Sequence, residues 1–119
     1  MANPNIALLA TMTGKTAVLV VTTTPTNAVD NTAASGKIFK INTLSIANID
    51  GTSSADITVS LYRSTVEYKL AHTVAVPADS SLLVITKDNT LYLEEGDAIR
   101  ITASANSMFH AVCSYDEIS

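Results

Sequence analysis

The chain has no tryptophan, one cysteine and two histidines, and it is poor in charged and aromatic residues. Among its 119 residues, 15% are charged and 5% aromatic, whereas roughly a quarter of a typical soluble domain is charged. The single cysteine, Cys113, excludes an internal disulfide, and its place in an apolar run indicates a packing role. The net charge of −4 and the scattered basic residues argue against nucleic-acid binding, which requires clustered lysine and arginine.

Signals for a membrane or for secretion are also missing. The apolar run from Ile6 to Ala10 is too short to span a bilayer, and no basic residue precedes it. We therefore expect a protein that is made in the cytoplasm and does not bind a membrane. Because charges are so few, much of the surface must be neutral. Such a surface is normal in a small β protein whose strand edges and faces are covered by neighbours, so it predicts assembly.

The residue patterns that carry catalysis are not found. No serine sits in a glycine-flanked turn, and the four glycines are too isolated to cradle a phosphate. His72 and His110 lie within strand-like segments, and neither has a partner at a spacing that completes a metal triad. We expect no catalytic residue, no cofactor and no metal ligand, and hence a protein that is not an enzyme.

The acidic turn from Glu94 to Asp97 allows two interpretations. Its carboxylates, with Asp88 and Asn89 nearby in sequence, could supply oxygen ligands to a calcium ion. Alternatively, Gly96 adopts a turn conformation and Asp97 accepts hydrogen bonds from the turn backbone. The second interpretation needs no convergence of distant side chains and is the one we favour.

Short alternating segments separated by turn residues dominate the chain. The clearest is 55–64, which places Ile57, Val59 and Leu61 on one face. The β-branched run 16–24 predicts the first strand, and the apolar run 82–86 predicts a strand buried on both faces. About eight short strands at intervals of roughly ten residues predict an all-β fold, an antiparallel β-sandwich resembling a jelly roll.

One strand changes register along its length. The large apolar residues switch from Phe39 and Ile41 to Leu44 and Ile46, which is an odd step in a period of two. A β-bulge near Asn42 would bring both pairs to the same face.

We interpret residues 1–15 as an extended N-terminal arm or edge strand and residues 16–119 as a single β-sandwich domain. The polar segment after Pro25 predicts a surface loop, with 27–35 as its contact region. Tyr62 points away from the expected core and is the one plausible platform for stacking on a sugar. The candidate contact residues are Ile6, Leu8, Leu9, Asn27, Asp30, Asn31 and Tyr62.

Several segments of the sequence resemble those of a known class of proteins. They are 45–51 (SIANIDG), 74–78 (VAVPA), 91–97 (LYLEEGD) and 113–119 (CSYDEIS). With them, the run from Phe39 to Ser119 resembles small virion structural proteins of tailed bacteriophages, cyanophages among them. The resemblance is a general similarity of short segments rather than a match to a residue-specific signature, and it covers about two thirds of the chain.

The resemblance implies a capsid decoration, or cement, protein that binds the capsid exterior, bridges neighbouring capsomers and forms a trimer. It implies a location in the virion and, as partners, the major capsid protein or other virion proteins. Alternatives are a neck, tail or fibre-associated virion protein, or a carbohydrate-binding or adhesive module.

Overall fold

The computed structural model describes residues 11–119, and in this range it contains nine β-strands, one short 3₁₀ helix and no α-helix. The all-β expectation is confirmed, with one strand more than the sequence predicted. No helix among these residues is long and apolar enough to cross a membrane. The strands are β1 (Met12–Val21), β2 (Thr26–Asp30), β3 (Ile38–Asn48), β4 (Ala55–Arg63), β5 (Val66–Val76), β6 (Ser81–Ile85), β7 (Leu91–Leu93), β8 (Ala98–Ala103) and β9 (Phe109–Ile118), with the 3₁₀ helix at Lys87–Asn89.

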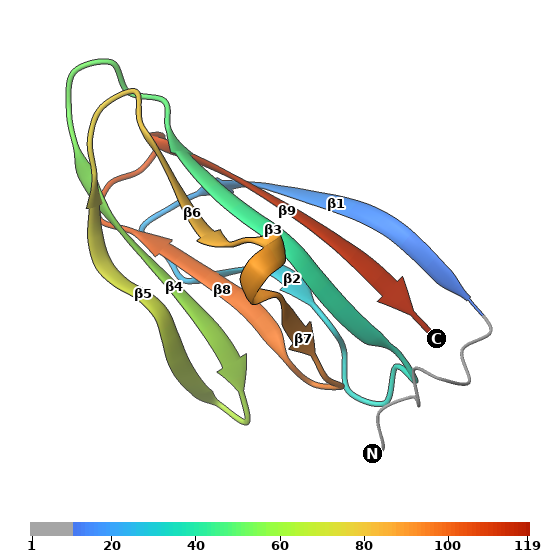
Figure 1. Cartoon of the computed structure of the whole chain (residues 1–119). Helices are drawn as coiled ribbons and strands as arrows, with labels where there is room; N and C mark the ends of the chain where they lie inside the picture. The colour runs from blue at the N-terminus through green and yellow to red at the C-terminus, as the bar shows by residue number, and fades with distance from the viewer. Residues whose placement is uncertain (1–10) are drawn as a thin grey trace.

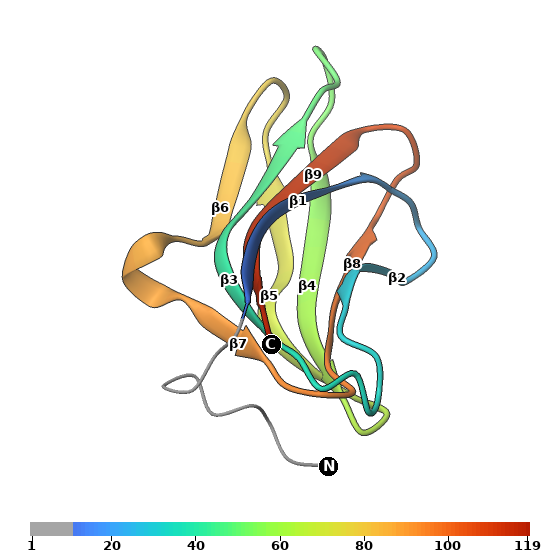
Figure 2. The ribbon, with the colours of Figure 1, turned by 90° about the vertical axis from the view of Figure 1, so that its right-hand side faces the viewer.

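The strands form two antiparallel sheets packed face to face. The first sheet has the order β1-β9-β3-β6, with β7 also paired to β3, and the second has the order β2-β8-β4-β5. The chain crosses between the sheets after β1, β2, β3, β5, β7 and β8, which interleaves early and late strands and gives the jelly-roll arrangement. Figure 2 shows the two layers, with β6 at one side of the molecule and β2 at the other.

The core lies between the sheets and is mainly aliphatic. Alternate residues of each strand point inward, so that Ile57 and Val59 of β4 and Ile99 and Ile101 of β8 are fully buried. Burying one such side chain contributes about 1.5–3 kcal/mol relative to leaving it exposed. Phe109 is the largest fully buried side chain among the described residues. The core occupies these inward positions, and function must use the opposite faces and the edges.

The bulge in β3 is confirmed. The register between β3 and β9 shifts between Ile41 and Thr43, where one extra residue enters β3. Phe39 and Ile41 before the shift and Leu44 and Ile46 after it are consequently all buried.

The segment after Pro25 is not the surface loop that its composition predicted. Residues 26–30 form β2, an edge strand that pairs with β8 and buries Val29. The prediction was wrong because an edge strand shows polar residues to solvent, and a register shift between Asn27 and Val29 breaks the alternation. Only residues 31–37 connect β2 to β3 without strand structure.

The apolar run 82–86 is likewise not buried on both faces. It lies in β6, which pairs with β3 at the edge of the first sheet, and the Leu83 side chain is 63% exposed. Ile85 on the opposite face is buried. A run of apolar residues cannot distinguish a central strand from an edge strand whose outer face is also apolar.

The first strand begins earlier than predicted, at Met12 rather than Thr16. Residues 12–15 are therefore part of an edge strand paired to the end of β9. Three of the predicted contact residues, Ile6, Leu8 and Leu9, lie outside the described residues.

Candidate interaction surface

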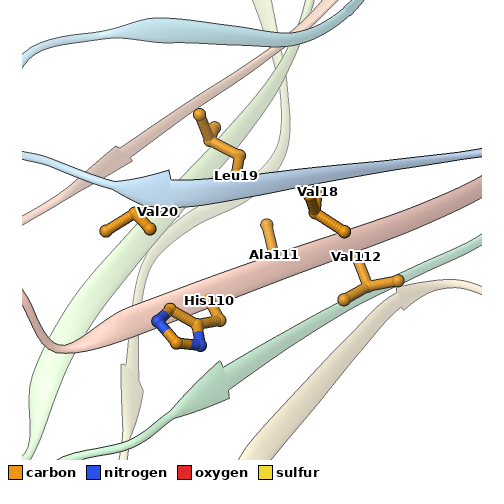
Figure 3. Close-up of a pocket in the computed structure, with 6 residues that line it drawn as sticks. All are labelled: Val18, Leu19, Val20, His110, Ala111 and Val112. Carbon is orange, nitrogen blue, oxygen red and sulfur yellow. The ribbon is translucent and has the colours of Figure 1, made fainter.

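A shallow apolar trough lies on the outer face of the first sheet, between β1 and β9. Val18 and Val20 of β1 stand beside Val112 and His110 of β9, in the cross-strand pairs Val18–Val112 and Val20–His110. The three valines are 76%, 56% and 43% exposed. With Leu19 and Ala111 they line a depression of about 330 Å³ (Figure 3).

Two rows of side chains that extend from the trough across the outer face are also neutral. The row that starts at Val18 and Val112 continues through Ser45 of β3 to the exposed Leu83 of β6. The next row runs from Val20 and His110 through Ala47 and likewise holds no acidic or basic side chain other than the histidine. A neutral sheet face with exposed valine and leucine is typical of a surface that a protein partner covers.

The trough adjoins an unguarded sheet edge. Within residues 11–119, β1 pairs on one side only, and its ten pairs with β9 run without a register shift. Thr11 and Ser119 exchange both backbone hydrogen bonds at 3.0 Å. Because main-chain groups alternate in direction along an antiparallel ladder, those of Val18 and Val20 point away from β9. Neither proline nor a bulge interrupts this edge.

The single charged residue of β1 does not protect the edge. Lys15 lies on the inner side of the sheet, where it forms an ion pair with Glu117 of β9, and Lys37 binds the second oxygen of the same carboxylate. The two lysine ammonium groups hold the pKa of Glu117 below its usual range, and Glu117 raises the pKa of Lys15. The three side chains close one end of the sandwich rather than repelling a neighbour.

The acidic turn is held by an arginine. The Nε and Nη2 atoms of Arg63 donate to the two carboxylate oxygens of Asp97 at 2.8 and 2.6 Å, and Nη2 also donates to Glu94 at 2.7 Å. Asp97 is 2% exposed, and its Oδ2 atom accepts a hydrogen bond from the Glu94 amide. Gly96 has a φ of +88°, which favours glycine. The turn interpretation is therefore confirmed.

The carboxylates of this turn already have partners within the fold. Besides the pairs of Arg63, the Glu95 carboxylate accepts a hydrogen bond from the Gly36 amide at 2.7 Å. Among residues 11–119, no three histidine, cysteine, aspartate or glutamate side chains are placed to hold a metal ion together. These contacts tie the β2–β3 connection to the turn before β8, which is a structural task.

The predicted contact residues near β2 divide into two kinds. Asn31 is fully buried, and its Nδ2 atom donates to the carbonyls of Lys37 and Leu93, each at 3.0 Å. Its amide therefore supports the fold of this copy, contrary to the expectation of an exposed contact residue. Asp30 and Asn27 are exposed. No sequence signal marks an asparagine as buried when its partners are main-chain carbonyls from distant strands.

Tyr62 is not an open stacking platform. It points away from the core, as predicted, but the guanidinium carbon of Arg100 lies 3.6 Å from the centre of its ring. The Nε atom of Arg100 donates a hydrogen bond to the side-chain oxygen of Asn27 at 3.1 Å. Its Nη1 atom lies 3.7 Å from a carboxylate oxygen of Glu67. A sugar ring would have to displace this cation–π contact to stack on that face.

The cysteine and the two histidines are the remaining candidate groups. The cysteine packs in the core, and the histidines are exposed to solvent. Cys113 is buried, and burial raises the pKa of its thiol to about 11. His72 is exposed on β5, while His110 is exposed at the trough. The sequence prediction identified 16–24 only as a strand and did not single out the trough residues. The available signal was the unbroken apolar run 17–21, which fills both faces of one strand.

Comparisons with known proteins bear on the fold alone. No protein-family model matches the sequence, and no curated protein matches it either. A solved chain from Bacillus endospore appendages, described as a novel family of disulfide-linked pili, is similar in structure with a TM-score of 0.54. The two share 14% sequence identity over 98% of this chain and 95% of that chain. At this identity, the likeness extends to the two-sheet architecture and no further.

Proposed function

We propose that the protein is a virion structural protein of a tailed bacteriophage, a capsid decoration protein that binds the capsid exterior and bridges neighbouring capsomers. The observation that carries the proposal is the neutral, apolar part of the outer face around the trough, beside an edge strand without protection. A face of this kind is typical of a surface that another protein covers. The resemblance of several sequence segments to small virion proteins of tailed phages is the basis for assigning this surface to a phage particle.

A decoration protein acts by adding contacts across the joints of a shell. Each copy that binds two capsomers stabilises the assembled state by mass action, because separating the capsomers requires the copy to release one of them. Many modest contacts then give strong retention through effective concentration. Such a role uses neutral surfaces and edges, which this chain offers, and needs no reactive group.

The likeness to an appendage subunit favours a second candidate, a fibre-associated virion protein that polymerises with itself. That neighbour belongs to disulfide-linked pili. In the 119 residues here, Cys113 is the one cysteine and it is buried, so a chain of copies would have to be held by non-covalent contacts. The covered ring of Tyr62 makes a sugar-binding module the weaker alternative.

The proposal is tested on purified particles. Heads and tails are separated from one phage preparation, and the chain is quantified in each fraction by mass spectrometry. A decoration protein should appear in the head fraction in many copies, and heads stripped of it should release DNA at a lower temperature until the purified protein is added back. Recovery in the tail fraction would replace the decoration role with the fibre-associated one, and recovery only as free protein would exclude both.

A further inference from the structure

The trough on β1 and β9 has a chemically matched occupant in the sequence. The ten residues before Thr11 contain no acidic or basic side chain, and they include the apolar run Ile6-Ala7-Leu8-Leu9-Ala10. The trough is lined by apolar side chains and one histidine. A neutral apolar segment on a neutral apolar surface loses no charge hydration on binding, whereas a charged segment would.

Leu8 and Leu9 of the run cannot reach the trough of their own copy. From Thr11, a fully extended chain advances about 3.6 Å per residue at most, so Ile6 reaches about 18 Å and Leu9 about 7 Å. Val18 and Val20 are seven and nine residues along β1, about 23 and 30 Å from Thr11 at the rise of a strand. The occupant, if it is this run, must belong to another copy.

The residue at which the described structure begins, Thr11, and the trough lie toward opposite ends of the sandwich. Thr11 lies beside Ser119, and β1 carries the chain away from that end (Figure 1). The trough lies at the far half of β1, next to the turn into β2. Where successive copies point in the same direction, a contact that joins one end of a copy to the other end of the next is heterologous, and repeated contacts of this type close into a ring or extend as a filament.

We infer that the run 6–10 of one copy lies in the trough of a neighbouring copy, between Val18 and Val20 of β1 and Val112 of β9, and joins copies head to tail. This inference rests on the proposed role in assembly and names the partner of the surface, a second copy of this chain. A ring of three would give the trimer implied for a decoration protein. An open series of the same contact would give a fibre.

A complementation experiment tests the contact with full-length chains. The double substitution Leu8→Asp with Leu9→Asp places charges in the run and leaves the trough unchanged. Val18→Glu places a charge in the trough and leaves the run unchanged. The matched control is Leu70→Glu, which adds the same charge at an exposed side chain of β5, in the second sheet and away from the trough and its outer face. Sedimentation velocity measures the mass of each variant and of an equimolar mixture of the first two.

We expect the wild type and the Leu70→Glu control to form the same oligomer. The run variant and the trough variant should each be monomeric, with self-association weakened at least about tenfold by a charge placed against apolar atoms. Their mixture should form a complex of two chains and no larger species, because one intact run meets one intact trough. A monomeric wild type, a spoiled variant that assembles normally, or a mixture that stays monomeric would overturn the inference.

A disulfide cross-linking experiment tests the same contact without introducing charges that could unfold the protein. Leu8→Cys with Val20→Cys, oxidised under mild conditions, should give a covalent series of dimers, trimers and higher species, since the reach excludes closure within one copy. Each single cysteine variant should stop at the dimer or below, and the buried Cys113 should not react. A doubly substituted chain that remains a monomer after oxidation would contradict the head-to-tail contact.

The two proposals can fail separately. If the chain is found on heads but the trough and run variants assemble and bind as the wild type does, the contact is wrong and the decoration role stands. If complementation succeeds and the chain is absent from particles, the contact stands and the decoration role is wrong.

Discussion

Arg63 balances the charge of a carboxylate that is almost fully removed from water. Asp97 is 2% exposed, and both of its oxygens accept hydrogen bonds from the Arg63 side chain, which is itself 41% exposed. Breaking a fully buried pair by removing one partner costs about 3–5 kcal/mol. Because Arg63 is partly solvated, we expect Arg63→Met to lower the free energy of unfolding by about 2–3 kcal/mol at neutral pH.

Urea denaturation followed by circular dichroism measures this loss. The control is Lys69→Met, which removes an exposed ion pair with Glu67 at 3.4 Å and should change stability by less than about 0.5 kcal/mol. If the two substitutions have equal effects, the Arg63 pair does not stabilise the turn before β8 as described.

Glu117 gives the fold a dependence on acidity with a defined sign. Hydrogen bonds from Lys15 and Lys37 lower its pKa in the folded state from the ordinary value of 4.5. Its contribution to stability is therefore present above about pH 4.5 and is lost as pH falls through the lowered folded pKa. Glu117→Gln should be less stable than the wild type at pH 7, and the difference should shrink toward zero below pH 4.

Unfolding curves of both proteins at several pH values measure this difference. The pKa of Asp50 is also lowered, by hydrogen bonds from Thr52 and Ser53, but Asp50 is present in both proteins and its effect cancels. A gap that stays constant from pH 7 to pH 3 would contradict the assignment of the ion pairs to Glu117.

At the scale of the element, the five residues of β6 include both a core side chain and a highly exposed apolar one. Ile85 is 3% exposed and packs in the core, while Leu83 points outward and is 63% exposed. Ile85→Ala should lower the free energy of unfolding by about 2–4 kcal/mol, since it removes buried methyl groups and leaves a cavity. Leu83→Ala should change it by less than about 0.5 kcal/mol. Equal losses measured by urea denaturation would mean that β6 is covered on both faces in the monomer.

The strands that were predicted well are those with one face in the core and the other face toward polar groups or solvent. β4 and β8 alternate because one side meets the core and the other meets polar groups, so a period of two is visible in the sequence. The bulge in β3 was visible for the same reason, as an odd step between two buried pairs. Edge strands β2 and β6 were misjudged, because their pattern depends on which strand they join, and that pairing is set by distant segments.

The candidate site was less predictable than the fold. Val18, Val20 and Val112 are ordinary strand residues by type, and they become a surface only because β1 and β9 bring them side by side over 90 residues of sequence. The buried Asn31 and the covered Tyr62 depend in the same way on Leu93 and Arg100, which are far away in the chain. Composition indicated only that neutral faces would occur, since charged residues are so few.

At the scale of the whole molecule, a neutral contact face predicts association that salt does not weaken. Apolar burial is unaffected by the screening that reduces ion-pair attraction, and ion pairs at the trough are not available from its lining residues. The dissociation constant of the oligomer should change by less than about threefold between 50 and 500 mM sodium chloride, and sodium sulfate should tighten it. Sedimentation equilibrium measures both, and a steep loss of affinity with sodium chloride would point to a charged interface elsewhere.

The backbone pairing of Thr11 with Ser119 has a practical consequence for labelling. A fluorescent protein or affinity tag joined after Ser119 would emerge at the pole where the run 6–10 departs, and its bulk would obstruct the next copy. An epitope placed in the turn at 64–65, between β4 and β5 of the second sheet, would avoid both β1 and β9. Reporter fusions of this protein should therefore be inserted internally rather than appended.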